Sequence, residues 1–156
     1  MHVHVVTVDH NLRAESAAEA LGVARVCAAH GLDHQTLLWT GWNGDGNLQA
    51  EARAARRSLL TDWARAKDLK AILLGHTTDD QAETLLMRLG RGSGVDGLSG
   101  MRPSTFRDGI IWLRPLLGVR RDTLRDWLRS REITWIDDPS NDDLRFDRAK
   151  ARRALV

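Results

Sequence analysis

Three side chains that could bind a substrate follow an apolar segment near the middle of the chain. His76, Asp80 and Glu83 come directly after Ala71 to Leu74, which resembles a buried strand. In an open parallel sheet, ligands bind where the chain leaves the carboxyl end of a strand. Residues three apart share one side of a helix, so the two carboxylates should lie together. Such a pair suits a positively charged amine or a transient Mg²⁺.

The helix that would carry these acids has a start signal. Thr78 and Gln81 have the spacing of a capping box, which predicts that the helix begins near Asp79. Asp80 and Glu83 then occupy one face, and the opposite face should pack. The expected packing residues are Ala82, Leu85, Leu86 and Leu89. A simpler interpretation stays open, in which the first acids only complement the positive end of the helix dipole.

A permanent metal site at this cluster is the less favoured interpretation. Zinc prefers more nitrogen or sulfur ligands than His76, Asp80 and Glu83 offer. We therefore expect no resident metal ion.

Two groups of basic residues could contact phosphate. Arg53 and Arg56 lie one turn apart on the preceding helix and could grip phosphate or a developing oxyanion, or could simply form its polar face. Between Arg145 and Arg153 there are five basic residues and one acid. That run fits contacts with phosphate, and equally fits a solvated helix end.

Composition indicates a globular chain of about one domain. It has 156 residues, 42% of them hydrophobic, and a net charge of +2 that says little about partners. No apolar run approaches a membrane span, so we expect no membrane partner and a cytoplasmic location. The single cysteine, Cys27, cannot form an intramolecular disulfide and is expected to be buried.

Strands and helices are expected to alternate over the first 90 residues. The predicted strands are Val3 to Val8, Thr36 to Trp39 and Ala71 to Leu74. The first helix should present Ala17, Leu21, Ala24 and Ala28 and end at Gly31, and the second should present Leu48, Ala52, Ala55, Leu59 and Trp63. This order predicts an α/β fold with a parallel sheet.

The rest of the chain is less regular. Glycine-rich segments at 90–94 and 97–100 predict a mobile loop. Beyond it we expect a short apolar piece at 110–113, a helix at 121–131, a short strand at 133–136 and a helical tail from Asp142. We divide the chain into a core domain, 1–100, and a C-terminal part with an Arg-rich tail, 101–156.

Six motifs occur together in an order that resembles the tRNA(Ile)-lysidine synthetase family. They are Val8-Asp9-His10-Asn11-Leu12-Arg13, Ala52-Arg53 with Arg56, Gly75-His76 with Asp79 to Thr84, the glycine-rich Arg91 to Met101, Arg114-Pro115-Leu116-Leu117, and Asp138-Pro139-Ser140-Asn141. The resemblance spans nearly the whole chain.

This resemblance implies a three-layer α/β/α ATP-pyrophosphatase domain of the adenine nucleotide alpha hydrolase type. The family uses ATP, with Mg²⁺ expected, to adenylate C2 of the wobble cytidine in the anticodon of an isoleucine tRNA, and free L-lysine then displaces AMP. Arg56, Asp80 and Glu83 would be catalytic. His76 would join the two acids in binding lysine, whereas Arg53, Arg56 and Arg148 would contact nucleotide, pyrophosphate or RNA.

The chain also departs from the family pattern. Ala149 and Arg57 replace the Asn and the aromatic residue that are usual there, and the family's N-terminal Ser-Gly-Gly-x-Asp-Ser phosphate loop is not found. We therefore expect a fragment, truncated at its N-terminus and inactive alone. Val3 to Val8 would then be an exposed strand edge, which favours a homodimer or aggregation.

Two other functions remain open at this point. One is a noncatalytic module that binds tRNA or nucleotide through the basic groups. The other is a tRNA thiolation enzyme of the same fold, which the single cysteine disfavours.

Overall fold

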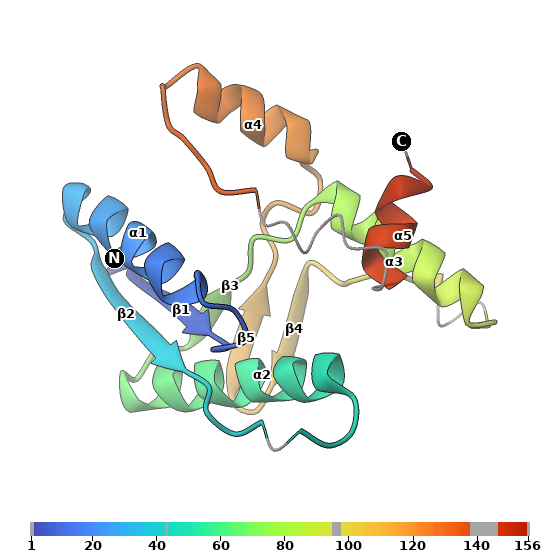
Figure 1. Cartoon of the computed structure of the whole chain (residues 1–156), viewed down its shortest axis with the longest axis horizontal. Coiled ribbons are helices and arrows are strands. Elements are labelled where there is room, and N and C mark those ends of the chain that lie inside the picture. Colours follow the sequence, from blue (N-terminus) through green and yellow to red (C-terminus); the bar gives the residue numbers. More distant parts are fainter. Residues whose placement is uncertain (1, 43, 95–97, 138–146, 156) are drawn as a thin grey trace. The chain divides into compact units, whose positions relative to one another are not determined.

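The computed structural model describes residues 2–42, 44–94, 98–137 and 147–155. It contains two compact units, one up to Lys70 and one from Ala71 onward. Figure 1 shows the helices and strands of both. The boundary that we predicted near residue 100 stays a prediction about domain organisation.

The described residues of the first unit form two parallel strands and two helices. In chain order they are β1 (His4–Asp9), α1 (Ser16–Ala29), β2 (Asp33–Leu38) and α2 (Leu48–Ala66). His4 lies opposite Asp33 and Asp9 opposite Leu38, so the carboxyl ends of β1 and β2 are level. This arrangement confirms the predicted β-α-β-α order, with β2 starting three residues earlier than expected.

Helix α1 ends as predicted but buries a different face. Gly31 has φ +64°, and its N–H donates to the carbonyl of Ala28 in a left-handed cap. The buried residues are Ala20 and Cys27, whereas Leu21 is 60% exposed. The predicted burial of Cys27 is confirmed, and the predicted packing stripe is wrong in phase. Small alanines occur all around this helix, so their spacing does not identify the inner face.

Helix α2 bears out the predicted stripe only in part. Its buried residues are Leu60, Thr61, Trp63 and Ala64, and the other four members of the stripe are half-buried. Asn47 caps it by accepting from the N–H groups of Gln49 and Ala50. Trp63, at the far end of the predicted stripe, is buried, and its indole Nε1 donates to Gln35 Oε1 at 2.9 Å. This bond ties α2 to β2.

In the second unit, the residues that the structure describes form a three-stranded sheet and three helices. The elements are β3 (Ala71–Leu73), α3 (Thr78–Gly90), β4 (Ser104–Arg107), β5 (Ile110–Leu113), α4 (Arg121–Arg129) and α5 (Asp147–Arg153). The strand order is β3-β5-β4, with β3 parallel and β4 antiparallel to β5. Asp108 and Gly109 join β4 to β5 with φ of +55° and +78°, as a tight hairpin requires.

The α/β class and the parallel pairing are confirmed, with two corrections. Strand β4 was not predicted. Residues 133–136 are not a strand, because Trp135 lies against the arginines of α4 instead of pairing along a sheet edge. The Asp138 to Asn141 motif lies outside the described residues, and the described part of the helical tail is α5. No helix in the described ranges is long and apolar enough to cross a membrane.

Candidate functional site

Helix α3 begins at Thr78, one residue earlier than predicted, and Asp80 caps its start. The capping pair is Thr77 with Asp80, not Thr78 with Gln81. Asp80 Oδ2 accepts from the backbone N–H of Thr77 and from its hydroxyl, both at 2.8 Å. An ionised carboxylate is a stronger acceptor than the Gln81 amide, which explains the shift. Asp80 is therefore partly committed to holding its own helix.

The Gln81 side chain holds the end of the glycine-rich segment instead of capping α3. Its Nε2 donates to the carbonyl of Met101 at 2.8 Å, and its Oε1 accepts from the Met101 N–H at 2.6 Å. A Cβ on Gly100, whose φ is +73°, would lie 3.1 Å from that same Oε1. Gly100 thus allows the close approach that the amide needs.

Replacing Gln81 by alanine is expected to lower the free energy of unfolding by about 2 kcal/mol, because two part-buried backbone groups lose their partner. Urea denaturation followed by circular dichroism measures this. Gln49→Ala, on the exposed start of α2, is the matched control, and equal losses in both variants would contradict the role given to Gln81.

Glu83 is the centre of the cluster. It is fully buried, and three arginines surround its carboxylate. Oε1 accepts from Arg152 Nε at 2.9 Å and from Arg121 Nη2 at 3.2 Å, while Oε2 accepts from Arg148 Nε at 2.7 Å. These ion pairs join α3 to α5 and to the first turn of α4, and Figure 1 shows α5 beside α3.

Asp80 and Asp79 extend this cluster. Asp80 Oδ1 forms an ion pair with Arg148 and lies 3.7 Å from Arg121 Nη2. Asp79 Oδ2 accepts from the backbone N–H of Arg121 at 2.7 Å, which anchors the start of α4. Arg148 therefore pairs with both Asp80 and Glu83, the two acids that the sequence predicted to bind a substrate.

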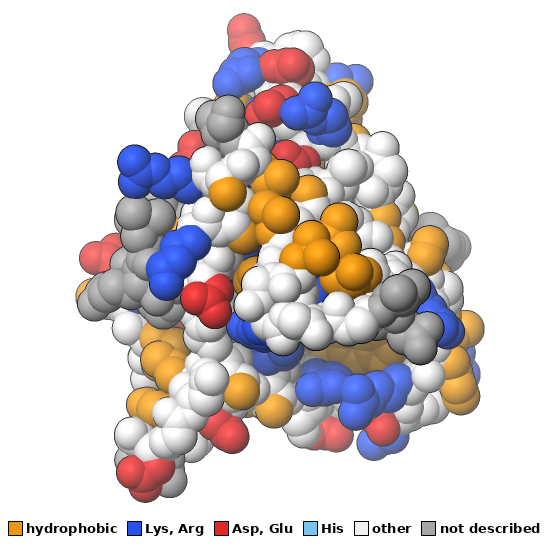
Figure 2. Space-filling model, turned by 90° about the vertical axis from the view of Figure 1, so that its right-hand side faces the viewer, with side chains coloured by type: hydrophobic (Ala, Val, Ile, Leu, Met, Phe, Trp, Pro, Cys, Tyr) orange, Lys and Arg blue, Asp and Glu red, His pale blue; other side chains and the backbone are white. Residues whose placement is uncertain are grey.

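The predicted orientation of α3 is wrong. Glu83 faces the interior, whereas Leu85 and Leu89, which were expected to pack, are 38% and 50% exposed. Figure 2 shows hydrophobic side chains at the surface on one face of the molecule, surrounded mostly by neutral side chains and backbone, with charged side chains farther out. Three guanidinium partners make burial of the carboxylate possible, and amphipathic spacing alone cannot reveal such partners.

Both acids are ionised at neutral pH. Burial opposes ionisation of Asp80, but hydrogen bonds from Thr77 and the charges of Arg148 and Arg121 hold its pKa below the ordinary 3.8. Burial likewise opposes ionisation of Glu83, and Arg152 and Arg148 hold its pKa below 4.5. Asp80 and Glu83 thus share three guanidinium groups, those of Arg121, Arg148 and Arg152.

Stability should therefore decline in acid. A carboxyl group with a lowered pKa in the folded state stabilises fully above its unfolded-state pKa and loses that contribution as the pH falls through the folded-state value. We expect the contribution to be complete above about pH 5 and to be lost progressively below it. Denaturation midpoints measured across this range should fall less steeply for Glu83→Gln than for the wild type. Parallel profiles would contradict the assignment.

A second cluster lies in the first unit, at the carboxyl end of β1. Asp9 is buried, and the Ser16 hydroxyl and the N–H of Asn11 hold its pKa below the ordinary value. The pKa of His10 is lowered mainly by desolvation of its imidazole, and also by the positive charge of Arg56. The pKa of Arg56 is itself lowered by desolvation of its guanidinium and by Arg53, although much of its side chain is exposed.

The structure thus brings five of the six predicted residues together in two groups. Arg53 and Arg56 interact in the first unit, and Asp80, Glu83 and Arg148 meet in the second. His76 lies half-buried in the turn between β3 and α3.

Sequence reasoning missed Arg121, and it considered Arg152 only as part of a basic run that could contact phosphate, not as a partner of Glu83. Arg152 lies one turn after Arg148 and shares its face, a spacing that could have indicated it, whereas no local pattern indicates Arg121. In the described ranges, no group of three His, Cys, Asp or Glu side chains could hold a metal ion.

Parallel strands joined by helices define an α/β protein, a class in which ligands bind at the carboxyl ends of the strands. The family model of the PP-loop domain matches residues 1–156, so the chain belongs to the PP-loop domain family.

Two curated proteins are similar to nearly the whole length of this chain. The tRNA(Ile)-lysidine synthase of Ruegeria pomeroyi is 61% identical over 152 residues, covering 97% of this chain and 36% of that protein. The tRNA(Ile)-lysidine synthase of Mesorhizobium japonicum is 49% identical over 157 residues, covering 97% of this chain and 35% of that protein. The chain therefore spans about a third of the length of these curated relatives.

A solved structure shares the fold. The U34-tRNA thiolase NcsA from Methanococcus maripaludis superposes with a TM-score of 0.78 over 98% of this chain and 55% of its own length. Its sequence identity is 15%, so this likeness concerns the fold alone.

Proposed function

We propose that this chain is the PP-loop part of an enzyme that makes lysidine in an isoleucine tRNA. The observation that carries the proposal is the 61% identity to a tRNA(Ile)-lysidine synthase across 97% of the chain. ATP, the tRNA anticodon and free L-lysine would be its substrates in the cytoplasm. The reaction would belong to the longer protein, since the relatives extend well beyond the matched region.

The chemistry needs two transfers. The wobble cytidine takes the adenylyl group of ATP and pyrophosphate leaves; the ε-amine of lysine then attacks C2, loses a proton and displaces AMP. We propose that Arg53 and Arg56 contact the phosphates, with Arg56 stabilising the charge that develops as pyrophosphate leaves. Mg²⁺ would arrive with ATP and be held mainly by its phosphates. Among the described residues there is no cluster of three His, Cys, Asp or Glu side chains that could hold a resident ion.

Asp80 and Glu83 must release an arginine before they can bind the ammonium group of lysine. Asp80 and Glu83 are already paired with arginines of this chain, so an added ammonium ion would have to compete with those guanidinium groups. We propose that lysine replaces Arg148, the most exposed of the three arginines, with a side chain 38% exposed against 27% and 24% for Arg121 and Arg152. His76, in the turn before α3, would complete the lysine site.

Product analysis tests this function. The chain, and the chain extended to the length of its relatives, are incubated with unmodified isoleucine tRNA and ATP labelled in the α-phosphate. We expect release of labelled AMP that requires both lysine and tRNA in the extended protein. Release that is independent of lysine, or that instead requires a sulfur donor, would overturn the proposal and favour thiolation.

We also propose that the isolated chain self-associates through β1. In the described part of its sheet, β1 pairs with β2 on one edge only, and the strand is rich in valine. Unpaired apolar edges promote association with another chain. Light scattering should show dimers or larger species that dissociate when Val6 is replaced by lysine. A monodisperse wild-type monomer would contradict this.

A further inference from the structure

Helix α4 and the segment after it, residues 120–137, form a structure that we call the α4 arm. Helix α4 buries none of its own residues. Trp127 is 50% exposed and Ile136 is 59% exposed. A helix with an exposed indole and no buried face has a surface available for a partner.

Arginines lie on both tryptophans of the arm. The guanidinium of Arg131 is 4.0 Å from the ring centroid of Trp127. Those of Arg129 and Arg125 are 5.3 and 5.8 Å from the ring centroid of Trp135. Flat guanidinium and indole groups stacked in this way are surfaces on which unpaired nucleobases stack.

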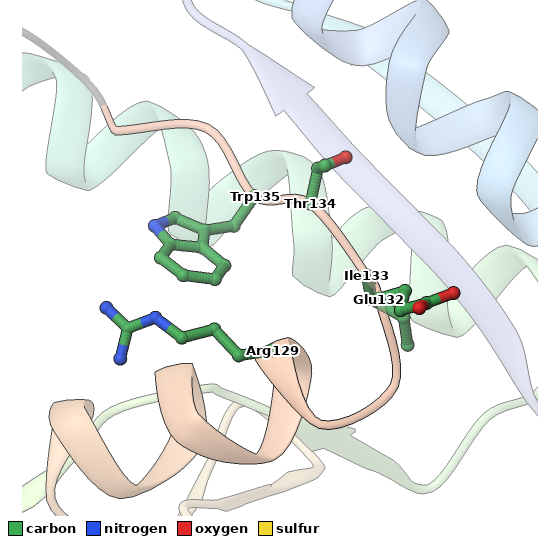
Figure 3. A pocket seen from close by; sticks show the side chains of 5 residues that line it. All are labelled: Arg129, Glu132, Ile133, Thr134 and Trp135. Carbon is green, nitrogen blue, oxygen red and sulfur yellow. The ribbon is translucent and has the colours of Figure 1, made fainter.

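A shallow cavity of about 380 Å³ lies beside the second stack. Figure 3 shows Arg129 and Trp135 on one side of it and Glu132 and Ile133 on the other. Its lining combines apolar atoms with the guanidinium group of Arg129, whereas the Glu132 carboxylate points away from Arg129 and Trp135.

The charges of the arm and of α5 favour the arm as the RNA contact. Two of the α5 arginines, Arg148 and Arg152, are bound to the buried Glu83. In the arm, Arg125 and Arg129 pair with acids, but Arg120 and Arg131 have no acidic partner within the described ranges. Within the described residues, the Arg131 guanidinium donates to the Trp127 carbonyl and the Ser130 hydroxyl. Exposed stacking surfaces with few free charges suit unpaired bases more than the phosphates of a duplex.

We propose that the α4 arm binds unpaired nucleotides of the tRNA substrate by stacking them on the Trp127–Arg131 and Trp135–Arg129 pairs. The identity of this RNA rests on the proposed function. The stacking itself is independent of ATP and lysine, so the two proposals can fail separately.

Fluorescence anisotropy with a labelled RNA hairpin tests the arm, using the full chain without ATP or lysine. The hairpin has the anticodon stem and loop of an isoleucine tRNA, and a blunt duplex of equal length is the comparison. We expect Trp127→Ala to weaken hairpin binding by about fivefold to a hundredfold. Arg131→Ala should weaken it too, and should reduce the slope of log K against log salt by about 0.7.

Arg25→Ala is the matched control, since Arg25 is exposed on α1 in the other unit. This substitution should change hairpin affinity by less than about twofold, because Arg25 is not expected to contact the RNA. Because α4 buries no residue, circular dichroism should be the same for all three variants. Equal affinities of Trp127→Ala and Arg25→Ala, or a duplex bound as tightly as the hairpin, would overturn the proposal.

Discussion

Replacing Glu83 by glutamine is expected to lower the free energy of unfolding by about 3 kcal/mol. The glutamine keeps the shape of the side chain but removes the negative charge that three guanidinium groups share. Because the arginines are partly exposed, water can solvate them once the carboxylate is gone. The expected decrease in the free energy of unfolding is therefore at the lower end of the range for breaking a buried ion pair. Urea denaturation followed by circular dichroism measures the change, and α5 should lose its protection in amide hydrogen exchange first.

Glu51→Gln is the control for that experiment. Glu51 is exposed in the first turn of α2, so its substitution removes the same charge at a cost below about 1 kcal/mol. A Glu83→Gln variant as stable as Glu51→Gln would show that the cluster does not hold α5.

In the protein extended to the length of its relatives, Asp80→Asn is expected to raise the KM for lysine by about tenfold to a hundredfold. A charge-assisted hydrogen bond to an ammonium ion is lost, which is worth about 1.5–3 kcal/mol. The KM for ATP should change by less than about threefold, because Asp80 is not assigned to ATP binding. Initial rates measured over a range of each substrate separate the two effects.

Asp122→Asn is the matched variant, since Asp122 is exposed in the first turn of α4. It should leave the KM for lysine unchanged. Equal effects of Asp80→Asn on lysine and on ATP would remove the reason for assigning Asp80 to lysine, and would indicate that its main role is to hold Arg148 and the start of α3.

The sequence predicted the strands and helices of the first unit because their signals are local. Asn47, Gly31 and the Trp63 stripe each determine one element boundary or face through nearby residues. The β4–β5 hairpin also had a local signal, since Asp108-Gly109 is a typical two-residue turn. That signal was overlooked because the flanking strands have only four residues each.

The candidate site could be predicted only in part. The acids were evident from their position after β3, but their environment depends on arginines 38 to 69 positions away in the sequence. No helical or strand period reports contacts at that distance. For this reason a face predicted to meet solvent proved to contain the most buried large side chain described, and the packing leucines proved exposed.

Nucleoside analysis of the tRNA tests the proposed lysidine synthesis most directly. Unmodified isoleucine tRNA is incubated with ATP, isotopically labelled lysine and the protein extended to the length of its relatives, then digested and examined by mass spectrometry. We expect one labelled lysine attached at C2 of the wobble cytidine, with none formed when ATP is omitted. An unmodified cytidine, or a sulfur-containing nucleoside elsewhere in the anticodon, would contradict this function.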